Sequence, residues 1–277
     1  IVHTYHGHVF HSYFSAFKTF IFKTIERLLA RKSSAIVVIS QLQKEELCYK
    51  FKIIPENKAH IIPLGFDLSR FSINQAEKRV AFRSHYEIHD NEILVVIVGR
   101  LAPVKNHDMF LKVVKSIKDS NSTNNFRFMI VGDGETRKHL EYTALTMGLS
   151  ISTPEEHIKN SDIIFTSWIK EIENVYSAAD ISVLTSLNEG TPVSLIESLA
   201  AGVPVVSTNV GGIADFITDG IHGFLTDTDQ IELFAQRVND LAGNAEKRKQ
   251  MAEKGREQVL KIFDLKRLVT DVTNLYT

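Results

Sequence analysis

The sequence predicts an α/β protein built from doubly wound parallel sheets, and three observations support this fold class. The chain has 277 residues, of which 44% are hydrophobic and 23% charged, a balance that excludes disordered and fibrous proteins. The continuous apolar run at 93–98 is typical of a strand covered on both faces. Segments with helical spacing of apolar residues alternate with such runs, which indicates βαβ units.

Composition and charge narrow the class of function. The 32 basic and 33 acidic residues give a net charge of -1, which lacks the charge excess of a nucleic-acid-binding protein, so no nucleic-acid partner is expected. The single cysteine, Cys48, excludes an internal disulfide and a cysteine-held metal site. No apolar run approaches the roughly 20 residues that span a bilayer. We therefore expect a cytoplasmic protein.

Residues 1–73 have the pattern of part of one α/β domain. We expect a strand at 1–5, a long helix at 13–31, a strand at 35–39 and a short strand at 61–62, followed by a turn at 63–67. Ile1–Thr4 looks like the middle of a buried strand, and no Met precedes it. We therefore expect the chain to be the carboxy-terminal part of a longer protein, with an incomplete first domain.

The rest of the chain predicts a linker and one complete domain. The polar stretch 74–91 is interpreted as the linker, and 92–262 as a Rossmann-like domain whose strands alternate with helices. The expected strands lie at 93–98, 126–131, 163–165, 181–185 and 205–208. The tail is helical from about Asn244, and 263–277 is interpreted as a helix that crosses back to the first domain.

The most informative segment is NEGTPVSLIE at 188–197. Thr191 as N-cap and Pro192 as first helical residue predict a helix directly after the strand 181–185. Ligands of open α/β sheets bind at such strand ends, where helix amides face phosphate. Glu189 would lie at this mouth and Glu197 on the helix flank, suited to sugar or ribose hydroxyls. The alternative is that Glu189 is an ordinary loop residue and Glu197 an ordinary solvated residue of the helix.

Two cations leave the end of the strand 93–98. Arg100 and Lys105 could together bind a diphosphate, although solvated surface cations are the alternative. Gly132 and Gly134 follow the next strand and fit either a close ligand approach or a tight turn. These glycines do not form a dinucleotide fingerprint.

Four histidines, His3, His6, His8 and His11, gather in the opening segment. No carboxylate or thiol accompanies them to complete a metal site, so we expect one neutral histidine to act as a hydrogen-bonding group at a strand end. The helix at 13–31 is basic and amphipathic. It fits an anionic membrane surface, or a crossover helix that packs on its sheet.

Taken together, these segments resemble the family 4 retaining glycosyltransferases along nearly the whole chain. The segments that carry the resemblance are HTYHGHVFHSYFS, VISQLQKEEL, IIPLGFD, GRLAPVKNHDMFL, VGDGE, NEGTPVSLIE, AAGVPVV and VGGIADFI. The resemblance implies the GT-B fold, with two Rossmann-like domains of which the first is incomplete. It also implies transfer of a sugar from a nucleoside-diphosphate sugar to a saccharide or lipid-linked saccharide, at the inner face of a membrane and without a metal or other cofactor.

The resemblance also implies roles for individual residues. It places Glu189, Arg100, Lys105 and His6 in the catalytic machinery. The residues that it implies in donor binding are Glu197, Gly190, Thr191, Pro192, Val193, Ser194, Gly65 and Gly132. The sequence departs from the family at Thr191-Pro192-Val193, where Phe-Gly-Leu is commoner, so one amide is missing at Pro192. Alternatives are a sugar-nucleotide epimerase of the same architecture and a non-catalytic nucleotide-sugar-binding protein.

Overall fold

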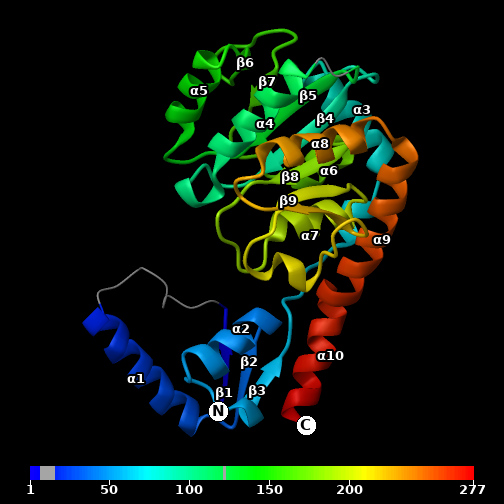
Figure 1. Ribbon diagram of the computed structural model, residues 1–277. Coiled ribbons are helices and arrows are strands. Elements are labelled where there is room, and N and C mark those ends of the chain that lie inside the picture. Colours follow the sequence, from blue (N-terminus) through cyan, green and yellow to red (C-terminus); the bar gives the residue numbers. More distant parts are fainter. Residues whose placement is uncertain (7–15, 121–122) are drawn as a thin grey trace.

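The computed structural model describes residues 1–6, 16–120 and 123–277, with the side chains of residues 16 and 17 left out, and folds them around two parallel sheets (Figure 1). The first sheet is small and has the order β1-β2-β3, with the strands β1 (Val2–Tyr5), β2 (Ala35–Val38) and β3 (Ala59–Ile61). Its helices are α1 (Ala16–Lys32) and α2 (Gln41–Glu45). Ile36 and Val38 pack with Leu47 and Ile53 in its core.

The second sheet is larger, and its order is β10-β9-β8-β4-β5-β7-β6 with every strand pair parallel. The strands are β4 (Ile93–Val98), β5 (Phe126–Val131), β6 (Ile151–Ser152), β7 (Ile163–Phe165), β8 (Ile181–Leu184), β9 (Val205–Thr208) and β10 (Gly223–Thr226). The sequence analysis identified five of them but missed the short β6 and β10.

Helices cover both faces of the second sheet. On β4, Val95 and Ile97 join one core, whereas Leu94 and Val96 join the other. The first core is covered by α4 (His107–Asp119), α5 (Arg137–Thr146) and α8 (Ile231–Ala242). The second is covered by α3 (Gln75–His85), α6 (Ile172–Ala178), α7 (Val193–Ala200) and α9 (Ala245–Phe263). The predicted doubly wound α/β architecture is confirmed.

The stretch 74–91 is not the linker that its polar composition predicts. It contains α3, which packs against α6 and places Phe82 in the second core, and Ile88 joins the same core just beyond the helix. Arg83 is only 2% exposed, because its guanidinium donates to the carbonyls of Ala178, His89 and Glu92 and to the Asp180 carboxylate. The polar composition of the stretch does not show that one of its charged side chains is buried.

The tail forms two helices, α9 and α10 (Leu265–Tyr276), and α10 runs beside the segment that connects the two sheets (Figure 1). Arg267 donates to the carbonyls of Pro63 and Leu64. A Cβ at Gly65 would lie 2.5 Å from that of Leu268, so only glycine allows this close approach. The packing of α10 thus explains Gly65 without any ligand.

Helix α1 leaves most of its described apolar side chains exposed. Ile21, Ile25 and Leu28 are 40%, 46% and 54% exposed, and Ala30 is the buried residue that α1 contributes to the first core. The Tyr5 hydroxyl donates to Glu26 at 2.5 Å and ties α1 to β1. Helix α1 connects the parallel strands β1 and β2, as the crossover-helix interpretation predicts, but most of its described apolar stripe is not buried against the sheet.

Candidate functional site

Two loops at the carboxyl ends of β4 and β8 bring Lys105 and Glu189 together. Lys105 Nζ lies 2.6 Å from Glu189 Oε1, which also accepts a bond from the Ser186 hydroxyl at 2.6 Å. The Glu189 side chain is only 9% exposed. The two residues are 84 positions apart in the chain, but parallel strands end at the same edge of a sheet, where their loops meet.

The two loops are also tied through their backbones. The Leu187 amide donates to the Val104 carbonyl at 2.8 Å. The Thr185 hydroxyl reaches the carbonyls of Lys105 and Asn106 at 3.2 and 3.0 Å. These bonds position the ammonium of Lys105 opposite Glu189, and no sequence pattern predicted Thr185 as a support of the site.

Helix α7 starts immediately beyond Glu189 and Gly190. The prediction of Thr191 as N-cap is wrong by one residue, because Pro192 takes an extended conformation (φ -73°, ψ 101°) at the cap position and α7 begins at Val193. No side chain caps the helix. The amides of Val193 and Ser194 are the first two of the helix and have no acceptor within it, so they can receive an anion.

Glycines behind the loop hold Glu189 in place. Gly211 has a φ of +57°, and a Cβ there would lie 1.7 Å from the Glu189 carbonyl oxygen. A Cβ at Gly212 would lie 2.4 Å from the Gly190 carbonyl oxygen, and the Gly212 amide donates to the Glu189 carbonyl at 3.2 Å. The paired glycines of VGGIADFI therefore set the position of the Glu189–Gly190 backbone.

Glu197 lies on the first turns of α7 and is held by a residue that the sequence analysis did not single out. Arg70 Nη2 donates to Glu197 Oε1 at 3.1 Å, and Arg70 Nη1 lies 3.8 Å from Glu173 Oε2. The Glu197 side chain is 16% exposed. Burial raises the pKa of Glu197, and the Arg70 charge opposes this rise. No sequence signal pointed to Arg70.

Arg100 is not bonded to Lys105 or Glu189 but pairs with Glu135 at 3.0 Å, and its side chain is 67% exposed. The glycines beside it pack closely: Gly132 has a φ of +138°, and a Cβ there would lie 2.0 Å from the Gly99 carbonyl oxygen. This close approach of two loops explains why a glycine is needed at position 132. The joint binding of a diphosphate by Arg100 and Lys105 remains a prediction.

His6 follows β1 directly and is exposed. His8 and His11 lie outside the described residues, so the histidine-rich segment can be assessed only at His3 and His6. The His3 ring makes an edge contact with Tyr5, with centroids 4.6 Å apart. The role of His6 beside a donor sugar stays a prediction.

Comparison with known proteins decides the family. A family model described as Glycosyl transferases group 1 matches residues 78–258. The chain belongs to the group 1 glycosyl transferases. A second model, described as Glycosyltransferase Family 4, matches residues 1–70 of this glycosyltransferase and confirms the resemblance drawn from its sequence.

Relatives of this glycosyltransferase are themselves named as transferases. It is 27% identical over 282 residues to UDP-Gal:alpha-D-GlcNAc-diphosphoundecaprenol alpha-1,3-galactosyltransferase of Escherichia coli, with 100% of the chain and 68% of the relative covered. It is 29% identical over 180 residues to GalNAc-alpha-(1->4)-GalNAc-alpha-(1->3)-diNAcBac-PP-undecaprenol alpha-1,4-N-acetyl-D-galactosaminyltransferase of Campylobacter jejuni, with 65% of the chain and 46% of the relative covered. The chain therefore spans about half to two thirds of the length of these relatives.

Solved structures confirm the GT-B fold for this glycosyltransferase. A glycosyltransferase of Rickettsia africae superimposes with a TM-score of 0.81 at 21% identity, covering 99% of this chain and 69% of the other. Anabaena HepE in complex with UDP and glucose gives a TM-score of 0.82 at 18% identity, covering 99% and 70%.

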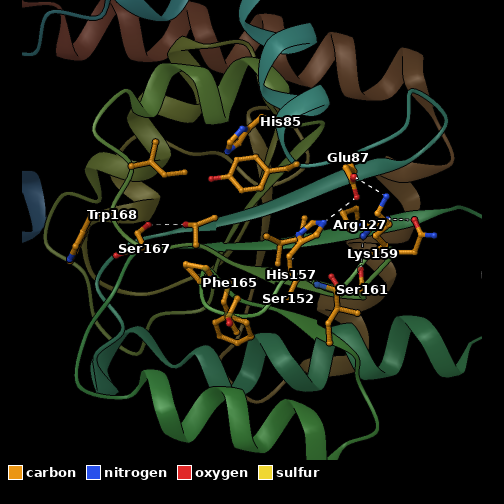
Figure 2. A pocket seen from close by; sticks show the side chains of 18 residues that line it. His85, Glu87, Arg127, Ser152, His157, Lys159, Ser161, Phe165, Ser167 and Trp168 are labelled. Carbon is orange, nitrogen blue, oxygen red and sulfur yellow. Dashed lines mark hydrogen bonds and ion pairs between the residues drawn. The ribbon is translucent and has the colours of Figure 1, made fainter.

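The glycosyltransferase has a separate cavity of about 570 Å³ over β7, between the end of α3 and the loop that precedes β7 (Figure 2). Glu87 bridges His157 and Lys159 at its rim, at 3.2 and 3.3 Å. None of the predicted site residues lines this cavity. The cavity and the predicted site are therefore separate features of the second sheet.

Neither a metal cluster nor a membrane span is found among the residues that the structure describes. No group of three or more His, Cys, Asp or Glu side chains in this part of the chain could hold a metal ion. Within the same residues, no helix has the length and apolar character needed to cross a bilayer. The absence of a cofactor remains an expectation.

Proposed function

We propose that the chain transfers a sugar from a nucleoside diphosphate to an acceptor hydroxyl, with retention of anomeric configuration, in the synthesis of a surface polysaccharide or glycolipid. The observation that carries this is the pair of carboxylates, Glu189 and Glu197, at the start of α7, each bonded to a cation from a different segment. The name of the Escherichia coli relative, with its UDP-sugar donor and lipid-diphosphate acceptor, supports the substrate class.

The leaving diphosphate gains negative charge as the sugar bond breaks. Lys105 and Arg100 at the end of β4 supply positive charge to it, and the amides of Val193 and Ser194 supply hydrogen bonds. Lys105 would exchange part of its contact with Glu189 for a phosphate oxygen. These groups provide the charge that a metal would otherwise bring, so the proposal requires no metal ion.

The two glutamates have different roles in this proposal. Glu197 accepts hydrogen bonds from the ribose hydroxyls, in the ground state and the transition state alike. Glu189 contacts the transferred sugar, on which positive charge develops during the reaction. His6 lies at the end of β1 as a hydrogen-bonding group for the same sugar.

Separate variants of the two glutamates test the proposal. Glu197→Ala should weaken UDP or GDP binding about tenfold, because it removes charge-assisted bonds of roughly 1.5–3 kcal/mol. Glu189→Gln should preserve nucleotide affinity and lower kcat about a hundredfold. Calorimetry with both nucleotides and steady-state transfer to a lipid-diphosphate saccharide measure these effects, with Glu257→Gln on the exposed face of α9 as control. The proposal fails if the folded chain binds neither nucleotide.

We also propose that α1 contacts an anionic membrane surface. Phe20 and Leu28 are 65% and 54% exposed, and basic side chains outnumber the single acid of α1, Glu26. An exposed apolar stripe with basic neighbours suits the headgroup region of a bilayer. Vesicles with and without phosphatidylglycerol should differ in binding, and added salt should reduce the difference. The double variant Lys18→Glu/Lys32→Glu should abolish the preference for vesicles that contain phosphatidylglycerol. The matched double variant Lys249→Glu/Lys254→Glu on α9 should keep that preference.

A further inference from the structure

Arg70 lies outside the second sheet, but its side chain reaches Glu197 of α7, the candidate ribose ligand. It belongs to a 3₁₀ turn, Ser69–Ser72, in the segment that joins the two sheets. Its guanidinium bonds Glu197 Oε1 at 3.1 Å and lies 3.8 Å from Glu173 Oε2. Arg70 and Glu197 are 127 positions apart in the chain.

The guanidinium of Arg70 is held in place by its own surroundings. It lies over the Phe71 ring, 4.8 Å from the centroid, and Phe71 is only 1% exposed. Phe71 in turn makes an edge contact with Tyr176 of α6, and the Arg70 carbonyl accepts a bond from Lys78 at 3.2 Å. An arginine stacked on a buried ring presents its donors in a fixed direction.

Glu197 would carry its charge poorly without this arginine. The groups that act on it are Arg70 from the 3₁₀ turn, and Glu173 and Tyr176 from α6. Glu173 is a like charge, and its Oε2 is buried without a hydrogen-bond partner among the described residues. The Tyr176 hydroxyl donates to the Ser194 carbonyl at 2.9 Å and is not directed at Glu197. Arg70 is thus the cation that offsets two partly buried carboxylates.

We propose that Arg70 is a positioning residue that keeps Glu197 ionised and oriented for the ribose, and so links the connecting segment to nucleotide binding. The inference rests on the proposed function, because it takes Glu197 as the ribose ligand. The Arg70 bond reaches Oε1, and Oε2 then remains for the ribose hydroxyls. Loss of Arg70 would leave burial and Glu173 to raise the pKa of Glu197 further, so that the carboxylate would take up its proton at a higher pH than in the unaltered chain.

The test is the pH dependence of UDP and GDP affinity, measured by calorimetry between about pH 5.5 and 8.5, a range set by the expected upward shift of a buried carboxylate. The unaltered chain should lose affinity only towards the acidic end of this range, because the Arg70 charge opposes the rise that burial causes in the pKa of Glu197. Arg70→Gln should bind about tenfold more weakly at the acidic end and recover as pH rises. Arg70→Lys should restore part of the affinity, and adding Glu173→Gln to Arg70→Gln should move the profile back to lower pH.

Each other outcome overturns a defined part of the argument. A loss in Arg70→Gln that is equal at all pH values, in a protein shown by thermal unfolding to be folded, would make Arg70 a merely structural residue. Normal affinity in Arg70→Gln together with weak binding in Glu197→Ala would reject the role of Arg70 alone. Normal affinity in Glu197→Ala, or no nucleotide binding by the unaltered chain, would reject the proposed function as well.

Discussion

The two glutamates at the start of α7 are held in different ways. Glu189 bonds Lys105 at 2.6 Å, with side chains 9% and 25% exposed, and both come from loops of the same sheet. Glu197 bonds Arg70 at 3.1 Å, with side chains 16% and 47% exposed, and Arg70 comes from the segment between the sheets. The Glu189 end is therefore built within one sheet, whereas the Glu197 end depends on how the connecting segment packs.

The largest effect on catalysis is expected from removing Lys105, the cation of the Lys105–Glu189 pair. Lys105→Ala leaves Glu189 partly buried without its partner and removes charge that faces the diphosphate, so kcat should fall by about 10³-fold. Arg70→Ala should instead act mainly on nucleotide affinity. Steady-state transfer and calorimetry separate the two, with Lys112→Ala on the exposed face of α4 as control. Equal effects of Lys105→Ala and Arg70→Ala on both quantities would remove the distinction.

Local patterns in the sequence identified the sheet that carries the site but not the contacts across it. The apolar run 93–98 and the motif around Glu189 and Glu197 were sufficient to predict strand, loop and helix, because each depends on neighbouring residues. Arg70, Ser186 and Thr185 were missed, because their partners lie on other segments or serve only as loop supports. The helix α3 was missed for the same reason, since Arg83 looks solvated until Asp180 is placed beside it.

Acid should lower the stability of the fold through His107, a buried residue near Lys105. His107 is 3% exposed, and neither ring nitrogen has a hydrogen-bond partner among the described residues. Burial and the nearby Lys105 lower its pKa from 6.5 to about 4. The unfolded chain therefore takes up the proton first as pH falls, and stability present above about pH 6.5 should be lost towards pH 4, by about 3 kcal/mol.

Denaturant unfolding at a series of pH values measures this loss. His107→Gln cannot titrate at that position, so its unfolding free energy should change less between those pH values than that of the unaltered chain. His139→Gln is the matched control, because His139 is 59% exposed and pairs with Asp108 at the surface. If His107→Gln still lost unfolding free energy steeply on acidification, another titrating group would be responsible for the loss.

A backbone change can displace Glu189 while leaving Glu197 in place. Gly211→Ala combines a positive φ with a Cβ 1.7 Å from the Glu189 carbonyl oxygen, which should cost about 2 kcal/mol of stability and lower kcat at least tenfold. Nucleotide affinity should change less than kcat. Gly220→Ala isolates the strain, because its φ is +74° and nothing lies within 4 Å of the added Cβ. Similar kcat values in the two variants would contradict the role of Gly211 behind Glu189.

The smallest effect is expected at Arg100, which lies at the same strand end as Lys105 but in an open position. Its ion pair with Glu135 joins side chains that are 67% and 49% exposed, and such surface pairs contribute little to stability, so Arg100→Ala should unfold like the unaltered chain. Contact with the diphosphate should appear as a several-fold loss of affinity for UDP or GDP, at most about tenfold, the scale of one charge-assisted hydrogen bond. UMP or GMP lacks the second phosphate and should lose less. Calorimetry with the mono- and diphosphates decides the matter, since equal losses for both would place Arg100 away from the diphosphate and leave Lys105 as the cation at that end.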